Sequence, residues 1–204
     1  MTQLSRTARR QRGLARSFRL PRLLRELTVL ETVYLAIREG AAPSDAAQSH
    51  RALIGQALDH LESLALVADA HRPVRDLPAC RQRLVEIAIA LATHPTLLLL
   101  DEPTDGVPPP ENGPILDLIS GLDRDMTVLL IEHNLDIVAS LTEHVTVLIA
   151  GSVAMEGSSE AVVARRANVE RTFSRLPPAA LQTMSDIVVR QADACESGAM
   201  PARD

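Results

Sequence analysis

The hydrophobic positions of this chain alternate between short apolar runs and stripes with helical spacing. The clearest run is LLLLDEP at 97–103, where four leucines are followed at once by two carboxylates and a proline. A continuous apolar run of this length is typical of a strand buried on both faces of a parallel sheet. Open α/β folds bind ligands at the carboxyl ends of such strands, so the acids are candidates for a ligand site. From these seven residues alone, a core strand followed by an acidic turn is an equal alternative.

The remaining hydrophobic pattern predicts an alternation of helices and strands. Apolar residues at helical spacing predict a helix over 27–37, and Thr28 with Glu31 forms a capping-box pattern at its start. A second apolar run at 126–131 predicts a strand that ends in an acid and an imidazole. The alternation from 82 to 149 predicts parallel pairing with right-handed crossovers. The other predicted helices lie at about 45–64, at 82–93, from Pro114 onward, at 135–141 and at 160–170, and Ser159 is the predicted cap of the last one. Two further strands are predicted at 144–149 and 153–155, and an amphipathic segment is predicted near 179–190.

Composition narrows the class of protein. The 204 residues are enough for one domain and a small subdomain, and 46% of them are apolar. Aromatic residues make up only 1%, which argues against a stacking platform for single-stranded nucleic acid. The net charge of −5 argues against general nucleic-acid binding. No apolar run approaches the roughly 18 residues of a membrane span. Cys80 and Cys195 have no metal-ligand spacing, and we expect them to be thiols in a reducing compartment.

The basic residues have an uneven distribution and an unusual composition. All 21 are arginines, and eight of these lie within the first 25 residues, which contain no acid. We expect residues 1–19 to form a solvated, partly disordered basic leader. A transit peptide is the alternative for this segment.

Four segments, in order, resemble parts of an ATP-binding cassette (ABC) ATPase. THPTLLLLDEPTDG at 93–106 resembles the Walker B strand and D-loop, and MTVLLIEH at 126–133 is similar to the switch strand and H-loop. The segment 144–157 resembles the strand pair that follows, and 15–33 resembles the Q-loop region. The sequence of about residues 14–165 is most similar to the ATPase subunits of branched-chain amino acid importers.

The resemblance implies a fold class and a set of site residues. The fold is α/β: a partial P-loop NTPase-like (ABC ATPase) fold, with a parallel sheet flanked by helices and a helical subdomain. Asp101 helps to hold Mg²⁺ on the phosphates of ATP, Glu102 polarises the attacking water, and His133 contacts the γ-phosphate. Asp105 of the D-loop is a nucleotide-binding position. Taken alone, a histidine such as His133 is more often a hydrogen-bonded loop residue than a catalytic one. The resemblance indicates that His133 descends from a catalytic histidine, but it does not establish that the residue is active in this chain.

The sequence departs from the family where phosphate is held. A P-loop needs G-x-x-x-x-G-K-[ST], whose backbone amides and lysine bind the phosphates. The 204 residues contain no such string and no lysine. We therefore expect an N-terminally truncated or degenerate subunit that by itself does not bind Mg-ATP at micromolar affinity. We also expect the loss of the P-loop strand to expose the flank of a buried apolar strand, which the basic leader does not replace.

Further departures affect positions that bind nucleotide in the family. Arg19 stands where the family has the Q-loop glutamine, so a fixed cation replaces a neutral amide. LPACR at 77–81 stands in place of the signature L-S-x-G-Q. Pro78 replaces a hydroxyl and lacks an N–H, and Cys80 replaces a glycine that allows close backbone approach. The Pro- and Gly-rich segment 107–114 is expected to shorten the following helix. By resemblance, the cofactor-binding positions are Arg19, Pro78, Ala79, Cys80, Arg81 and Asp105.

These patterns divide the chain into four parts. They are a basic leader (1–19), a helical subdomain that touches the permease (20–76), a Walker B and switch part of the core (77–170), and a partly disordered tail (171–204).

The leading interpretation is an ATP-binding subunit of a branched-chain amino acid importer, impaired in ATP hydrolysis. The resemblance implies ATP and Mg²⁺ as cofactors. It also implies a membrane permease and a second ATPase subunit or a second copy as partners, no nucleic acid, and a peripheral place on the cytoplasmic face of the inner membrane. A non-catalytic module that docks on a permease or an intact ATPase subunit, or a gene remnant, stays an alternative. An unrelated α/β domain would require strands 97–101 and 126–131 not to be adjacent and parallel.

Overall fold

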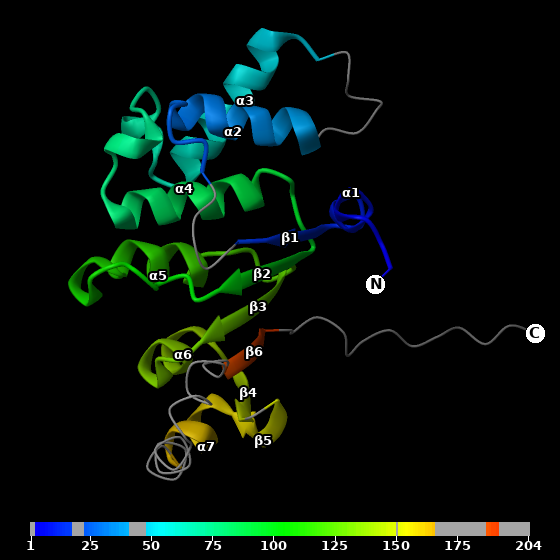
Figure 1. The fold of residues 1–204 in the computed structure, drawn as a ribbon, viewed down its shortest axis with the longest axis vertical. Coiled ribbons are helices and arrows are strands. Elements are labelled where there is room, and N and C mark those ends of the chain that lie inside the picture. The colour runs from blue at the N-terminus through cyan, green and yellow to red at the C-terminus, as the bar shows by residue number, and fades with distance from the viewer. Residues whose placement is uncertain (1–2, 18–22, 41–47, 150, 166–186, 192–204) are drawn as a thin grey trace, which may run out of the picture.

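The fold is built on one mixed sheet, seen in a computed structural model that describes residues 3–17, 23–40, 48–149, 151–165 and 187–191. In this part of the chain the sheet has six strands in the order β1-β2-β3-β6-β4-β5 (Figure 1). The strands are β1 (Leu14–Arg16), β2 (Leu97–Asp101), β3 (Thr127–Glu132), β4 (His144–Ile149), β5 (Ser152–Ser158) and β6 (Ile187–Gln191).

The parallel part of the sheet is formed by β1, β2 and β3. Leu97 lies opposite Thr127 and Asp101 opposite Ile131, so β2 and β3 end at the same edge. On its other side, β2 pairs in parallel with β1. The predicted strand at 97–101 and its parallel pairing with the next predicted strand are confirmed. An unrelated α/β domain without this adjacency is thereby excluded.

The flanks of β2 are both covered, which corrects the expectation of an exposed strand. The basic leader supplies β1, so the expectation that this segment contributes no strand is wrong. A turn at Gly13 makes the pairing possible, because this residue has φ of +78° and a Cβ there would lie 2.5 Å from the hydroxyl oxygen of Thr96. A strand of three residues is too short to show an alternating pattern, which explains why the sequence did not reveal it.

A second correction concerns β3 and β4, which are not paired directly. The strand β6 lies between them and is antiparallel to both. The predicted parallel pairing therefore holds for β2 and β3 but not for β3 and β4. The predicted amphipathic piece near 179–190 overlaps β6 only at 187–190, and the rest of it lies outside the described residues.

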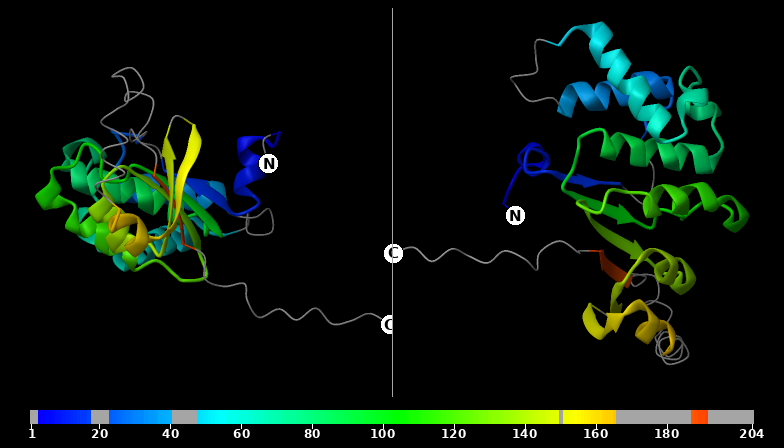
Figure 2. Two further views of the ribbon diagram at one scale, coloured as in Figure 1. Left: turned by 90° about the horizontal axis from the view of Figure 1, so that it is seen from below. Right: turned by 180° about the vertical axis from the view of Figure 1, so that it is seen from behind.

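The two faces of the sheet are covered unequally. Leu98 and Leu100 are fully buried, whereas Leu97 and Leu99 are only half-buried. The prediction of a strand buried on both faces is therefore wrong. Successive side chains of a strand point to opposite faces, and α5, α6 and α7 lie on one side of the sheet, with α1 on the other (Figure 2). The helices are α1 (Arg6–Arg10), α2 (Val29–Gly40), α3 (His50–Ser63), α4 (Ala79–Leu91), α5 (Gly113–Ser120), α6 (Leu135–Leu141) and α7 (Ser159–Val163).

The helices α2, α3 and α4 gather at the β1 end of the molecule (Figure 1). The capping box that begins α2 is confirmed: the Glu31 carboxylate accepts from Thr28 N at 2.8 Å, and Thr28 Oγ1 accepts from Glu31 N at 3.2 Å. The bonds from the Thr28 backbone and hydroxyl lower the pKa of Glu31. The predicted helix at 135–141 and the strand at 144–149 have the predicted bounds.

The last helix differs from its prediction at both ends. Ser158, not Ser159, caps α7, because its side-chain oxygen accepts from Ala161 N at 3.3 Å. The backbone N–H of Ser159 instead donates to Glu143 O at 2.9 Å. The helix ends at Val163 rather than near 170, and the chain beyond 165 is not described until 187.

Candidate functional site

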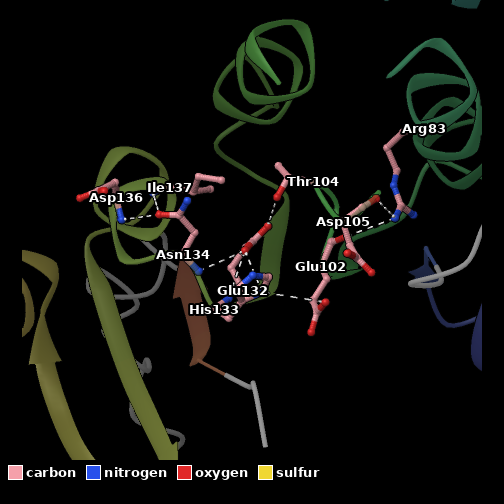
Figure 3. Close-up of polar contacts among 9 residues, drawn as sticks. All are labelled: Arg83, Glu102, Thr104, Asp105, Glu132, His133, Asn134, Asp136 and Ile137. Carbon is pink, nitrogen blue, oxygen red and sulfur yellow. Dashed lines mark hydrogen bonds and ion pairs between the residues drawn. The ribbon is translucent and has the colours of Figure 1, made fainter. Parts of the chain in front are cut away.

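Two loops meet where β2 and β3 end, and they carry the predicted catalytic residues (Figure 3). The backbone N–H of Glu102 donates to Ile131 O at 2.9 Å, so the loop after β2 stays attached to β3 beyond the last paired residue. His133 follows β3 directly, and its Nδ1 lies 3.9 Å from Glu102 Oε2. The structure thus brings together Glu102 and His133, which are 31 positions apart in the sequence.

A buried arginine of α4 holds the turn that presents Glu102. Glu102 has φ of +44°, a conformation that costs a non-glycine residue about 1–2 kcal/mol. The Nη2 of Arg83 donates to Glu102 O at 3.2 Å and to Asp105 O at 3.4 Å. Arg83 also forms an ion pair with Glu86 at 2.6 Å, and both side chains are buried. These contacts place a fixed cation behind the acidic turn and offset its strain.

A buried carboxylate connects the two loops. Glu132 accepts a hydrogen bond from the Thr104 hydroxyl on the loop after β2. Its other oxygen accepts from the backbone N–H groups of His133 at 3.1 Å and Asn134 at 3.4 Å. The side chain of Asn134 in turn caps α6 by accepting from two backbone N–H groups of its first turn. The position of His133 therefore depends on Glu132 and on the start of α6.

The site has one buried and one accessible reactive group. The Glu102 side chain is 2% exposed, whereas the His133 side chain is 55% exposed. A carboxylate in such a position can orient a water or a proton, and an exposed imidazole beside it can contact an anionic ligand. This chemistry serves phosphoryl transfer only when other groups also hold the phosphates.

Asp101 ends β2 and is the predicted Mg²⁺ ligand. Its Oδ2 accepts from Arg16 Nη2 at 2.9 Å. Mg²⁺ in ATPase sites is bound by one or two carboxylates plus phosphate oxygens, so a single aspartate suits a metal that arrives with a nucleotide. Within the described residues, no group of three or more His, Cys, Asp or Glu side chains is placed to hold a metal ion. A single aspartate therefore fits a Mg²⁺ ion whose remaining ligands are phosphate oxygens or water.

The predicted signature residues begin α4, and several of them have structural contacts. Pro78 is the N-cap residue and provides no side-chain cap. Cys80 is buried, and burial raises the pKa of its thiol, with Glu111 adding to the shift and Arg81 opposing it. Arg81 Nε donates to the Asp69 carboxylate at 2.7 Å, and its Nη2 donates to Ala65 O at 3.0 Å.

The three remaining predicted positions have different outcomes. Asp105 lies in the turn after β2, where its N–H donates to Glu102 O at 3.0 Å, and its role toward a nucleotide stays a prediction. Arg19 lies outside the described residues. Ala79 opens α4, and its proposed role also stays a prediction. Sequence reasoning did not assign a role to four residues that organise the site: Arg16, Arg83, Thr104 and Glu132.

A signal existed for two of these four residues. Glu132 directly follows the apolar run VLLI at 128–131, and Arg83 adjoins the apolar stripe of a predicted helix, where a charge needs a partner. Thr104 and Arg16 are ordinary turn and strand residues, and nothing in their spacing indicates a partner.

Comparison with known proteins identifies relatives that cover about three quarters of this chain. The ABC transporter family model matches residues 1–105, just over half of the 204 residues. The high-affinity branched-chain amino acid transport ATP-binding protein BraF of Pseudomonas aeruginosa is 31% identical over 163 residues, which cover 74% of this chain and 64% of BraF. The probable branched-chain amino acid transport ATP-binding protein LivG of Methanocaldococcus jannaschii is 33% identical over 156 residues, covering 72% and 61%. The chain thus spans less than two thirds of these relatives.

Solved structures agree with the sequence relatives. An ATP-binding cassette of an ABC transporter is 30% identical, with a TM-score of 0.67 over 79% of this chain and 69% of that one. The ADP conformation of such a cassette has a TM-score of 0.68 at 28% identity, covering 88% and 70%. None of the helices in the described ranges is long and apolar enough to cross a membrane. The chain belongs to the ABC transporter family and has the α/β fold of its ATP-binding cassettes.

Proposed function

We propose that this chain acts as an ATP-binding subunit of a branched-chain amino acid importer. The observation that carries the proposal is the convergence of Asp101, Glu102 and His133 at one edge of the sheet. The two acids follow β2, the histidine follows β3, and the two strands are adjacent and parallel. The relatives BraF and LivG are branched-chain amino acid transport ATP-binding proteins, and this similarity supports the proposed transport system and class of cargo.

The proposed roles follow from the chemistry and accessibility of each side chain. Asp101 offers a hard oxygen ligand to the Mg²⁺ of Mg-ATP, which neutralises charge on the phosphates when bound. Glu102 orients water from a buried position that the Arg83 contacts hold in place. His133 presents an exposed imidazole next to that carboxylate. Asp105 and the segment Pro78, Ala79, Cys80 and Arg81 are the proposed nucleotide contacts, together with Arg19.

The chain by itself is proposed to bind and hydrolyse ATP poorly. The 204 residues offer no glycine-rich cradle and no lysine to hold the β- and γ-phosphates. Phosphoryl transfer relies on positioning and charge neutralisation, so the carboxylates alone supply little catalysis. We expect isothermal titration to detect no micromolar binding of Mg-ATP by the purified chain. Tight, Mg-dependent binding would overturn this part of the proposal.

The proposed partners are a membrane permease and a second ATPase subunit or second copy, at the cytoplasmic face of the inner membrane. A related cassette that is 27% identical has been solved as a dimer. The helical segment 20–76, which includes α2 and α3, is the proposed permease contact.

Co-purification with permease subunits of a branched-chain amino acid system tests the partner proposal. Arg51→Glu reverses an exposed charge on α3, and we expect it to weaken the complex. Arg124→Glu is the matched control, because Arg124 is also exposed but lies in the loop between α5 and β3. If the unaltered chain does not co-purify, the subunit assignment is wrong. If both variants weaken the complex equally, the assignment of the contact to α2 and α3 is wrong.

The second candidate is a non-catalytic module that docks on a permease or on an intact ATPase subunit. The engagement of Arg81 with Asp69 and the burial of Cys80 favour it, because these signature positions serve the fold. Glu102→Gln in the purified complex separates the candidates. A drop in phosphate release would exclude the docking module, whereas unchanged release is the result expected of the module and of a subunit that contributes little hydrolysis.

A further inference from the structure

The proposed Mg²⁺ ligand is already bound to a cation from within the chain. Arg16 Nη2 lies 2.9 Å from Asp101 Oδ2, as both a hydrogen bond and an ion pair. The Arg16 side chain is 50% exposed and that of Asp101 is 22% exposed. The pair is therefore accessible to an ion from solvent rather than sealed in the core.

The sheet register explains why these two side chains meet. Arg16 lies opposite Leu99 in the parallel pairing of β1 and β2. Asp101 is two residues beyond Leu99, so it points to the same face and is the diagonal neighbour of Arg16. A guanidinium on a long stem reaches across this diagonal. The contact is thus a consequence of the register of β1.

The chemistry of the pair makes the guanidinium and a divalent cation rivals. The guanidinium of Arg16 is a cation that already binds Asp101, so an incoming metal ion meets a charge of its own sign. Both cations seek the same carboxylate oxygen, and like charges at this separation repel each other. A metal that binds Asp101 must therefore displace Arg16 or accept the repulsion.

We propose that Arg16 is the resident counter-ion of Asp101 and that a divalent cation binds there only by displacing its guanidinium. This inference rests on the proposed role of Asp101 as the Mg²⁺ ligand. It assigns Arg16 as a positioning residue that holds Asp101 at the end of β2 in the absence of metal.

The test uses Mn²⁺ alone as the probe, with the full chain and no nucleotide. Free Mn²⁺ is followed by its electron paramagnetic resonance signal during titration. Arg16→Gln removes the rival cation, and we expect it to tighten Mn²⁺ binding about threefold, the order expected for loss of a half-exposed ion pair. Arg12→Gln makes the same change of net charge at an exposed arginine of the same segment, and its affinity should match that of the unaltered chain.

Asp101→Asn combined with Arg16→Gln locates the effect, because the gain should vanish when the carboxylate is removed. Equal affinity of the unaltered chain and Arg16→Gln would overturn the inference, as would no measurable binding by Arg16→Gln. A gain that persists without Asp101, or that Arg12→Gln shares, would also overturn it.

A conservative variant covers a failure of Arg16→Gln to fold. Arg16→Lys keeps the charge but lacks the planar fork, so its Mn²⁺ affinity should exceed that of the unaltered chain by less than threefold. An unchanged affinity would count against the inference. Because no nucleotide or permease is present, these outcomes are separate from a failure of the proposed transport function.

Discussion

The hydroxyl of Thr104 donates a hydrogen bond to the buried carboxylate of Glu132, and this contact ties the loop after β2 to the loop after β3. The two residues are 28 positions apart in sequence. Glu132 also accepts a hydrogen bond from the backbone N–H of His133. The Thr104 hydroxyl on the loop after β2 therefore stabilises the carboxylate that orients the loop after β3.

Replacing Thr104 with Val tests the strength of this connection. The exchange keeps the shape of the side chain but leaves a buried carboxylate oxygen without its donor. We expect the free energy of unfolding to fall by about 1–3 kcal/mol, as measured by urea denaturation. Thr7→Val at an exposed position should change it by less than about 0.5 kcal/mol. Equal effects at both positions would show that the contact between Thr104 and Glu132 adds nothing to the free energy of unfolding.

Arg83 is predicted to be among the most sensitive positions of the core. Arg83→Met leaves the Glu86 carboxylate buried without its ion-pair partner and removes a donor to Glu102 O. We expect a loss of about 3–5 kcal/mol in the free energy of unfolding. The double variant with Glu86→Leu should recover part of this loss, because it also removes the buried carboxylate that Arg83→Met leaves behind. Arg75→Met, which breaks an exposed pair with Glu26, should cost less than about 1 kcal/mol.

Replacing a glycine by alanine within α3, and an alanine by glycine just after its C-terminus, should each stabilise the fold. Gly55 lies within α3 with nothing near its absent Cβ, so Gly55→Ala should add about 0.5–1 kcal/mol. Ala65 follows the helix with φ of +55° and is exposed, so Ala65→Gly should add about 1 kcal/mol by relieving left-handed strain. Ala52→Gly, within the helix, is the control and should destabilise. Thermal and urea unfolding measure all three, and a loss of stability in Ala65→Gly would contradict the argument.

The stability of the fold should depend on pH through His60. Burial lowers the pKa of His60, although the hydrogen bond of its Nε2 to Ala88 O at 2.8 Å opposes the shift, and the charge of His94 adds to it. The native state therefore favours the neutral imidazole, whereas the unfolded chain takes up a proton below about pH 6.5. This contribution is present above that pH and is lost as the pH falls through the folded-state pKa.

Denaturation from about pH 7.5 to about pH 5 measures this dependence. His60→Gln keeps a donor for Ala88 O but cannot titrate, so its free energy of unfolding should fall less with decreasing pH than that of the unaltered chain. His71→Gln, at an exposed position, should leave the pH dependence unchanged. If His60→Gln and the unaltered chain lose stability in parallel, the acid sensitivity comes from other groups.

Much of the core was predictable because its patterns are local. The strand at 97–101 and the helix at 135–141 have the predicted bounds, since four leucines and a helical stripe are complete within a few residues. The meeting of Glu102 and His133 followed from one further step, the adjacency of two parallel strands. The short strand β1 and the strand β6 were not predicted, because their hydrogen-bond partners lie far away in the sequence.

By itself, the sequence determined the α/β alternation, the order of the acidic and imidazole groups along the chain, and the resemblance to ABC ATPases. Only the tertiary structure decided that one face of β2 is half-buried and that Arg83 donates a hydrogen bond to the turn of Glu102. It also decided that Arg16 forms an ion pair with Asp101. The physical reason is that periodicity and turn chemistry act over a few residues, whereas the partner of a charge is set by strand register and helix packing. Those depend on contacts between segments that are distant in the sequence.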